Sequence, residues 1–336
     1  MHRIEYASPT TREQAVKLLG TDPAAAAPLA GGSDLLALMK SGVETPKRLV
    51  NLKGIAGLAN VRPDRAKDGL GGLRIGALMV LDDLAADAAL GFEYPAVTAA
   101  AGRLAGPQIR NVATLGGNLL QRPRCWYYRN GFGLLGLLDG KSMIPIGDYR
   151  YHAILGNTGP AYFVSPSTLA PVLIAVGAQA VLFGPAGERR VELEKIYRIP
   201  KTEGEREHDL RPGEILTEIL LPPAAGRKIA SYEVRQRETL DWPLASAAVA
   251  LETGPDGKVA QARVVLGQVA PMPWISADAA EALKGKALDA PLVAAVADAA
   301  VRTAFSLEGN HYKIQLARVA VKRALTAAAG LLADEG

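Results

Sequence analysis

Two glycine turns are the parts of this chain best suited to chemistry. The first is AGGSD, residues 30–34, which stands between a short apolar segment and the helix-forming run LLALMK. Glycines admit positive φ and leave backbone N–H groups open to a ligand, and N–H groups at the start of a helix favour anions. The turn therefore fits a pyrophosphate, although a plain tight turn is the alternative for so short a motif.

The second turn is TLGGN, residues 114–118, and it follows the segment PQIRN. A threonine hydroxyl, glycine N–H groups and a carboxamide suit a diphosphate and the hydroxyls of a ribityl chain. A simple turn between a helix and a strand is again the alternative. Two such turns are both explained if they converge on one elongated cofactor. Neither matches GxGxxG or GxxxxGK[ST], so a Rossmann or P-loop site is disfavoured.

Directly after the second turn comes RCWYYR, residues 124–129, with the single cysteine of the chain, Cys125. One cysteine cannot form an intrachain disulfide or a four-cysteine iron–sulfur cluster, and we expect Cys125 to be a small buried hydrophobe. Trp126, Tyr127 and Tyr128 either stack on a ring or a partner, or they pack while Arg124 and Arg129 reach solvent. Both interpretations remain open from the sequence.

Composition excludes several classes of function. Hydrophobic residues make up 49% of the chain and charged residues 21%, as in a globular protein, and the net charge of +4 includes no basic block that predicts nucleic-acid binding. The longest apolar run, residues 169–184, is interrupted by Pro171, Gly177 and Gln179, so no membrane span is expected. The start of the chain lacks a signal-peptide pattern, which makes the cytoplasm the expected location. A metal site is not expected, because His2, His152, His208 and His311 lack ligand spacing.

The elements that position the turns follow from apolar spacing and turn residues. We expect a helix over 12–19, a strand–turn–helix over 27–40 with Ser33-Asp34 as the cap, and a strand over 48–52. A second strand–turn–helix over 72–85 is expected to be capped by Asp82 or Asp83. Further predictions are a helix over 94–106, a helix running into a strand over 169–184, and an exposed charged loop over 200–214. From residue 227 the pattern predicts antiparallel strands with a hairpin turn at 254–258, and helices from about residue 276.

These motifs, taken in order, resemble one known family. PLAGGSDLLALMK, QIRNVATLGGNLLQRPRCWYYR, YHAILGN, LRPGEILTEILLP and YEVRQRETLDWPLASAAVAL are similar to the flavoprotein (medium) subunit of the xanthine dehydrogenase/CO dehydrogenase family, in the branch of aldehyde oxidoreductases and 4-hydroxybenzoyl-CoA reductases. The resemblance implies an α+β fold. Its parts are an FAD-binding PCMH-type (vanillyl-alcohol-oxidase-like) domain over 1–225, with α/β subdomains of about 1–55 and 56–225, and an α+β CO-dehydrogenase-flavoprotein-like domain over 226–336.

The resemblance also implies a function. The chain would bind FAD and pass electrons from two [2Fe–2S] clusters on a small subunit to an external acceptor, while a large subunit holds the molybdenum cofactor, in a heterotrimer or its dimer. Ala30, Gly31, Gly32, Ser33 and Asp34 would cradle the pyrophosphate, and Leu29 and Leu35 beside them would also bind the cofactor. Thr114, Leu115, Gly116, Gly117 and Asn118 would hold its other side and the ribityl chain. Ile109, Arg110 and Thr168 would line the cofactor, and Leu216 would lie against the isoalloxazine ring.

The chain departs from the family pattern at three places. No cysteine follows Cys125, so we expect the [4Fe–4S] cluster of that branch to be absent and FGLLGLL to fill its volume with apolar packing. Thr168 stands where the family has an aspartate. Glu233 stands where it often has a lysine, which predicts a lower flavin potential or a different acceptor. These departures leave a second hypothesis, a degenerate homologue that serves as a structural or assembly subunit.

Overall fold

In the computed structural model, which describes residues 3–66, 68–224, 226–237 and 241–331, the N-terminal unit is a parallel sheet in the order β1-β3-β2. Its elements are β1 (Glu5–Ala7), α1 (Arg12–Leu19), β2 (Ala26–Leu29), α2 (Leu35–Lys40), β3 (Arg48–Asn51) and the 3-10 turn η1 (Leu52–Gly54). The Thr11 side chain accepts a hydrogen bond from the N–H of Gln14, and the helix ends at Gly20 with φ of 62°. The predicted helix and the strand–turn–helix are both confirmed.

The second unit is an antiparallel sheet in the order β4-β5-β10-β8-β9. Its strands are β4 (Val61–Pro63), β5 (Leu73–Gly76), β8 (Gln179–Gly184), β9 (Gly187–Glu192) and β10 (Ile215–Leu221). The last of these, β10, is buried along its whole length and lies at the centre of the sheet. Its register shifts between Leu216 and Glu218. Such a bulge changes the direction of nearby side chains, and it lies here beside the site described below.

The helices of this unit pack against the sheet or against one another. They are α3 (Leu81–Ala86), α4 (Ala88–Glu93), α5 (Pro95–Gly102), α6 (Pro107–Arg110), α7 (Leu115–Leu120), α9 (Leu169–Ala175) and the 3-10 turn η3 (Leu193–Ile196). The predicted helix running into a strand over 169–184 is confirmed as α9 and β8. The predicted capping by Asp82 or Asp83 is wrong, because α3 begins after Val80 and both aspartates lie within its first turn. There they still favour the helix by facing its positive N-terminal end.

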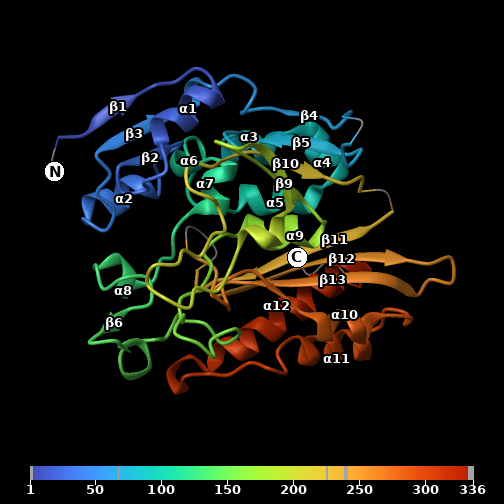
Figure 1. Ribbon diagram of the computed structural model, residues 1–336. Coiled ribbons are helices and arrows are strands. Elements are labelled where there is room, and N and C mark those ends of the chain that lie inside the picture. Colours follow the sequence, from blue (N-terminus) through green and yellow to red (C-terminus); the bar gives the residue numbers. More distant parts are fainter. Residues whose placement is uncertain (1–2, 67, 225, 238–240, 332–336) are drawn as a thin grey trace.

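The C-terminal unit is a second antiparallel sheet in the order β11-β12-β13-β14. Its elements are β11 (Lys228–Val234), β12 (Ala245–Thr253), β13 (Val259–Gly267), β14 (Trp274–Ile275), α10 (Ala277–Leu283), α11 (Ala290–Ala300), η4 (Glu308–Asn310) and α12 (Tyr312–Ala329). Alternate residues of β12 belong to different cores: Ala248 and Ala250 pack with α9, whereas Ala247 and Val249 pack with α12. The sheet therefore lies between α9 and helices α10–α12 (Figure 1). None of the helices in the described ranges is both long and apolar enough to cross a membrane.

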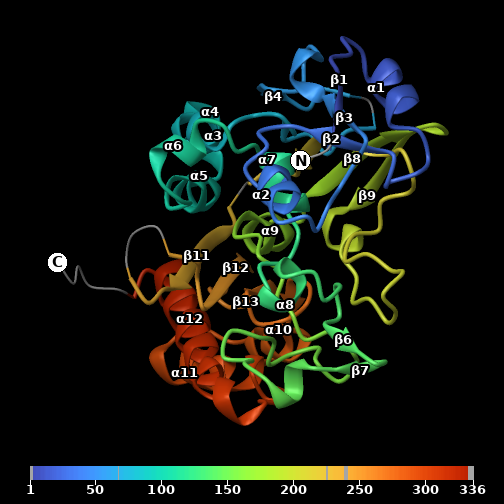
Figure 2. The same cartoon turned by 90° about the vertical axis from the view of Figure 1, so that its left-hand side faces the viewer.

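Between α7 and α9 the chain is mostly irregular. It contains α8 (Trp126–Arg129), a short hairpin of β6 (Leu137–Leu138) and β7 (Lys141–Ser142), and the 3-10 turn η2 (Ile144–Ile146). Figure 2 shows this segment below α2 and beside the C-terminal unit. Leu134 and Leu135 are buried in a small core with Tyr128 and Phe163, as the FGLLGLL prediction requires. Phe132 and Leu138 are 46% and 56% exposed, so for them the predicted packing is wrong.

Sheets and helices together form the predicted α+β architecture. The units differ in strand direction, since the N-terminal sheet is parallel and the other two large sheets are antiparallel. Parallel strands need crossover connections, and α1 and α2 provide them here.

Candidate functional site

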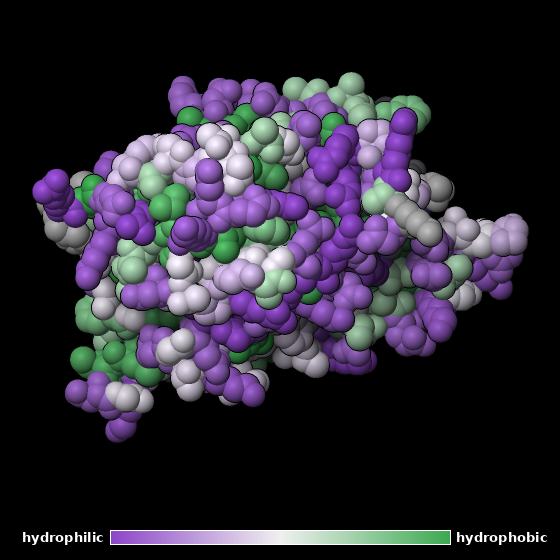
Figure 3. All heavy atoms as spheres, turned by 45° about the horizontal axis from the view of Figure 1, so that its top comes forward, coloured by the Kyte–Doolittle hydropathy of each residue, from purple (hydrophilic) through white to green (hydrophobic). Residues whose placement is uncertain are grey.

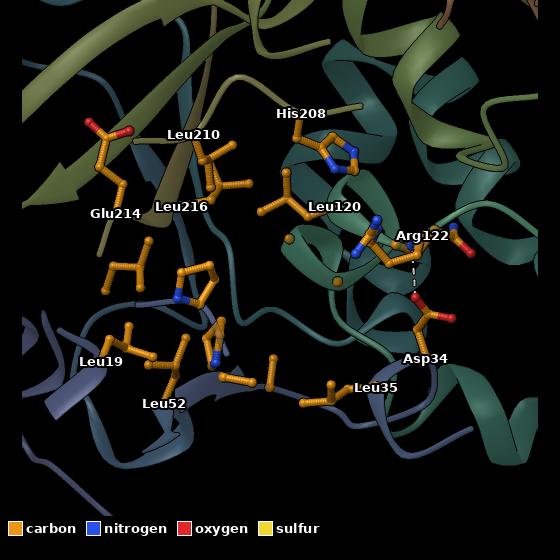
Figure 4. Close-up of a pocket in the computed structure, with 18 of the residues that line it drawn as sticks. Leu19, Asp34, Leu35, Leu52, Leu120, Arg122, His208, Leu210, Glu214 and Leu216 are labelled. Atoms are coloured by element: carbon orange, nitrogen blue, oxygen red, sulfur yellow. Dashed lines mark hydrogen bonds between the residues drawn. The ribbon is translucent and has the colours of Figure 1, made fainter. Parts of the chain in front are cut away.

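A cleft of about 370 Å³ lies where the N-terminal unit meets the five-stranded sheet (Figure 4). The first glycine turn lines one side of it through Ala30–Leu35, and the second lines the other through Thr114, Gly116 and Gly117. The two turns, which are far apart in the sequence, therefore meet around one hollow. We call it the glycine cleft. Other side chains in its wall are those of Leu19, Leu52, Leu120, Arg122, His208, Leu210 and Leu216.

In the first turn, glycine is required at two positions for different reasons. Gly32 has a φ of +75°, which other residues rarely adopt. A Cβ atom on Gly31 would lie 1.8 Å from the carbonyl oxygen of Val112, so the first turn touches the backbone just before the second turn. The backbone N–H groups of Gly31, Gly32 and Ser33 donate to no acceptor within the described part of the chain. Because backbone donors need partners, this turn offers hydrogen bonds to an anionic ligand in the cleft.

The second turn is organised differently. Its Thr114 hydroxyl accepts a hydrogen bond from the N–H of Gly117 at 3.0 Å, which caps α7. Gly116 donates its N–H to the carbonyl oxygen of Ala77 at 2.7 Å. A Cβ atom on Gly116 would lie 3.0 Å from both that oxygen and the Ala77 Cβ. The glycines of this turn therefore serve close packing, and their N–H groups are used within the protein.

Asp34 links the first turn to the arginine-rich segment. Its Oδ2 accepts a hydrogen bond from the N–H of Arg122 at 2.8 Å, and its Oδ1 accepts one from Arg129 Nη2 at 2.7 Å. Arg124 Nη2 lies 3.1 Å from the same Oδ1. Asp34 therefore occupies the N-cap position of α2 as predicted, but its side chain makes no capping hydrogen bond, because the carboxylate binds the arginines instead.

Arg122 is held in the cleft wall by two carboxylates. Its Nε donates to Glu207 Oε1 and its Nη1 to Glu44 Oε1, both at 2.5 Å. Burial alone would lower the pKa of Arg122, but neighbouring negative charges, led by Glu207, raise it. Burial would likewise raise the pKa of the Glu207 carboxyl, but the neighbouring basic groups outweigh this effect and lower the pKa.

The ion-pair network beside the cleft carries a net positive charge. Four arginines, Arg122, Arg124, Arg129 and Arg206, share three carboxylates, Asp34, Glu44 and Glu207. One positive charge is therefore left over next to the free N–H groups of the first turn. Positive charge and N–H donors together favour a ligand with anionic oxygens.

His208 also lines the cleft, and it lies in a loop, residues 200–214, that is less exposed than predicted. Burial lowers the pKa of His208 to about 4, so the imidazole is neutral at neutral pH. The ring lies 5.5 Å from the ring of Tyr197. The loop of residues 200–214 was expected to be exposed throughout, but Glu207 is only 4% exposed. Its ion pair with Arg122, a residue far away in the sequence, makes this burial possible.

Six of the predicted site residues lie outside the lining of the glycine cleft. Leu29 and Leu115 are buried behind the turns, and Ile109 is 46% exposed. Arg110 pairs with Asp82 at 3.0 Å and donates to the carbonyl oxygens of residues 104 and 105. These side chains therefore support the turns or face solvent.

The other two of the six are Asn118 and Thr168. Asn118 Oδ1 accepts a hydrogen bond from Ser167 Oγ at 2.8 Å, so it ties α7 to the start of α9. Thr168 is 4% exposed, and its Oγ1 has no hydrogen-bond partner among the described residues. Glu233, on β11, is partly buried and paired with Arg235 and is not part of the cleft wall. Its predicted influence on a flavin stays a prediction.

The aromatic–basic segment after the second turn faces inward. Tyr128 is buried, and the guanidinium of Arg122 lies 4.9 Å from the centre of its ring. Arg124 and Arg129 both pair with Asp34, and their side chains remain 33% and 17% exposed, so they reach solvent only in part. Cys125 packs against the small core around Tyr128, and its Sγ lies 3.2 Å from His152 Nε2. Burial raises the pKa of its thiol, so Cys125 is not a reactive thiolate.

Sequence reasoning found Asp34 but missed Arg122 and its two carboxylate partners. Arg122 lies four residues after the second turn, but nothing near it in the sequence identified Glu44 or Glu207 as partners. No cluster of three or more His, Cys, Asp or Glu side chains suitable for a metal ion occurs in residues 3–66, 68–224, 226–237 and 241–331.

Comparison with known proteins identifies the family of this chain. Residues 2–224 match the FAD binding domain in molybdopterin dehydrogenase, and residues 230–328 match the CO dehydrogenase flavoprotein C-terminal domain. The chain is 34% identical over 294 residues to the aldehyde oxidoreductase FAD-binding subunit PaoB of Escherichia coli, covering 86% of this chain and 87% of the relative. It is 31% identical to the carbon monoxide dehydrogenase medium chain of Hydrogenophaga pseudoflava, covering 97% of both.

Solved structures agree. A structure of carbon monoxide dehydrogenase from Hydrogenophaga pseudoflava, in a form lacking the Mo-pyranopterin moiety of the molybdenum cofactor, superimposes with a TM-score of 0.74 at 30% identity and covers 99% of both chains. The chain therefore belongs to the family of FAD-binding medium subunits of molybdenum-hydroxylase-type oxidoreductases.

Proposed function

We propose that the glycine cleft holds FAD and that the first glycine turn binds the pyrophosphate. The observation that carries this proposal is the set of unpartnered N–H groups at Gly31, Gly32 and Ser33. Gly31 and Gly32 place no side chain over these donors, and the nearby arginine network adds positive charge. The donor set and the charge both fit two phosphate groups. Thr114, Gly116 and Gly117 face the same hollow and enclose the cofactor from the other side.

Apolar side chains complete the binding site. In Figure 4, Leu19 and Leu52 from the N-terminal unit face Leu210, Leu216 and Leu120 across the hollow. Flat rings are usually bound by apolar walls with a few polar groups, so these leucines would pack against the rings of FAD, with Leu216 against the isoalloxazine. Arg122 and neutral His208 would set the charge around it. Bound FAD supplies the ability to take up electrons from one carrier and release them to another.

We further propose that this chain works with partner subunits. A small subunit with two [2Fe–2S] clusters would deliver electrons, and a large subunit with the molybdenum cofactor would oxidise the substrate, in a heterotrimer or its dimer. The surface in Figure 3 is mostly hydrophilic with hydrophobic patches, and large apolar side chains such as Phe92 and Ile146 are each 89% exposed. Such residues suit contacts with partners. We also propose a cytoplasmic location for the complex.

The test begins with the absorption spectrum of the purified chain. Flavin bands without an iron–sulfur shoulder, or their appearance after FAD is added, support the proposal. Gly32→Ala is expected to weaken FAD binding at least tenfold, because it strains the backbone and brings a Cβ to 3.0 Å from Leu36 Cδ1. Gly57→Ala is the matched control, since it has a φ of +81° with nothing within 4 Å of the added Cβ.

The degenerate homologue, a structural subunit without redox activity, is the second candidate function. The altered Asp and Lys positions motivate it. A colourless protein that takes up no added FAD, yet copurifies with a large and a small subunit, would favour this candidate and contradict the FAD site.

A further inference from the structure

The two ends of the glycine cleft are held closed by different kinds of contact. One wall of the cleft comes from the N-terminal unit, and the other comes from the five-stranded sheet with its helices and loops. At one end the walls join in an apolar core that contains Leu19, Phe183 and Ile215. At the other end, near Asp34, they join through ion pairs, beside a small apolar core that contains Leu38 (Figure 4).

Glu44, in the loop between α2 and β3, makes the ion pairs that we call the ionic clasp. Its Oε1 pairs with Arg122 Nη1 at 2.5 Å and with Arg206 Nη2 at 3.3 Å. The hydroxyl of Tyr128 donates to the same oxygen, also at 3.3 Å. Arg122 follows α7, and Arg206 lies in the loop before β10. One carboxylate oxygen of the N-terminal unit therefore fastens two separate segments of the opposite wall.

The ionic clasp can open at a low cost in free energy. The Glu44 and Arg206 side chains are 27% and 45% exposed, so water and salt screen their attraction. Arg122 is more buried, but Glu207 pairs with its Nε. When Glu44 moves away, the buried guanidinium therefore keeps a carboxylate partner, which avoids the large penalty of an unpaired buried charge.

The size of the cleft indicates that its walls have to separate. The cleft measures about 370 Å³, near the lower end of the range of about 300–1,000 Å³ for sites that hold drug-sized molecules. FAD is larger than such molecules, so a wider opening is needed for the whole cofactor to enter. The chain connects the N-terminal unit to the rest of the protein once, through residues 52–60, which allows this unit to swing.

We propose that the ionic clasp controls the exchange of FAD: the N-terminal unit turns about residues 52–60 to admit the cofactor, and Glu44 then fastens the cleft. The inference rests on the proposed function, since FAD is the ligand whose exchange is controlled. Glu44 is a positioning residue, because it acts through Arg122 and Arg206 on the position of the N-terminal unit. Loss of the clasp leaves the donors of the first turn in place and raises the fraction of open molecules. Uptake and release of FAD then both become faster.

Stopped-flow flavin fluorescence of the full chain, with partner subunits where they copurify, measures the uptake and the release of FAD. Glu44→Gln, which breaks both pairs, is expected to accelerate both rates about fivefold, and Arg206→Gln, which breaks one, about threefold. Asp209→Asn is the matched control. It breaks an exposed pair with Arg198, but both residues lie outside the N-terminal unit, so the rates should change less than about twofold.

The two clasp variants change the local charge in opposite directions. Glu44→Gln removes a negative charge and Arg206→Gln a positive one, so attraction of anionic FAD alone would slow release in the first variant and speed it in the second. The clasp predicts faster release in both. The proposal is overturned by opposite effects on release, by unchanged rates in Glu44→Gln, or by faster release without faster uptake, which indicates loss of a direct contact with FAD.

Hydrogen exchange separates the clasp from the FAD site. The N–H of Arg122 donates to Asp34 Oδ2 across the two walls, so its exchange with D₂O reports opening without any cofactor. Faster exchange of this amide in Glu44→Gln than in Asp209→Asn is expected. A wild-type chain that takes up no FAD overturns the proposed function, and with it the control of FAD exchange. FAD binding with unchanged rates and unchanged amide exchange overturns the clasp alone.

Discussion

The two glycine turns look alike in sequence and differ in physical role. In the first, Gly31 and Gly32 keep side chains away from donors that remain free, and Asp34 fastens the turn to three arginines. In the second, Gly116 uses its N–H and its lack of a side chain to pack against Ala77. A pair of glycines thus marks close approach of backbone in both turns, but only the first offers its N–H groups to a ligand.

The strongest test of this difference is Gly31→Ala. The added Cβ would lie 1.8 Å from the Val112 carbonyl oxygen, so the first turn must move. We expect roughly 3 kcal/mol of destabilisation, as for severe overpacking, and at least a hundredfold loss of FAD affinity, measured by denaturant unfolding and fluorescence titration. Gly91→Ala is the control, because nothing lies within 4 Å of its added Cβ. Normal FAD binding in Gly31→Ala would remove the first turn from the site.

Asp34→Asn tests the ion pairs that distinguish the turns. The change removes the charge that neutralises Arg124 and Arg129, and a stability loss of about 2–3 kcal/mol with roughly tenfold weaker FAD binding is expected. Asp82→Asn is the counterpart at the second turn. It breaks the pair with Arg110, and because the Asp82 side chain is 42% exposed, the loss should be under about 1 kcal/mol. Equal losses in the two variants would contradict the comparison.

Protein stability should depend on pH through a group near the first turn, because His208 lies beside the ion-pair network that holds this turn. The pKa of His208 falls from 6.5 in the unfolded chain to about 4 in the folded chain, so the unfolded state binds more protons between these values. Its contribution to stability is present above pH 6.5 and is lost as the pH falls toward 4. At pH 5 the loss is about 2 kcal/mol. Denaturant unfolding at pH 7 and pH 5 measures it.

His208→Gln is the control for that measurement. It removes the titrating group, so the decrease in stability between pH 7 and pH 5 should shrink by about the same 2 kcal/mol. Burial also lowers the pKa of His152 to about 4, so part of the decrease should persist in the variant. An unchanged pH dependence in His208→Gln would show that the imidazole is not buried in its neutral form.

The smallest effect is expected for Gly117→Ala in the second turn. The added Cβ would lie 3.0 Å from Thr114 Oγ1, a side-chain atom that can shift, and alanine favours the helix. Stability should change by less than about 1 kcal/mol. FAD affinity should fall less than in Gly31→Ala. A larger loss of affinity at unchanged stability would show that the second turn contacts the cofactor as closely as the first.

Local signals predicted the elements well. Thr11 and Gly20 mark the ends of α1, and the antiparallel strands β11–β13 form in the region predicted from the sequence. Predictions failed where a side chain had a partner distant in sequence. Asp34 occupies the N-cap position of α2 as expected, but its side chain binds arginines instead of capping the helix. Glu207 was expected in an exposed loop and is instead buried beside Arg122.

The sequence by itself determined the family, the α+β class and the existence of two glycine turns, because these depend on the order and spacing of residues. Only the tertiary structure decided which turn has free donors, because that depends on which backbone lies within hydrogen-bond distance. It also decided where the charged groups pair and that Glu44 joins two segments of the opposite cleft wall. Pairing across space follows from the packing of sheets and helices, which no local pattern records.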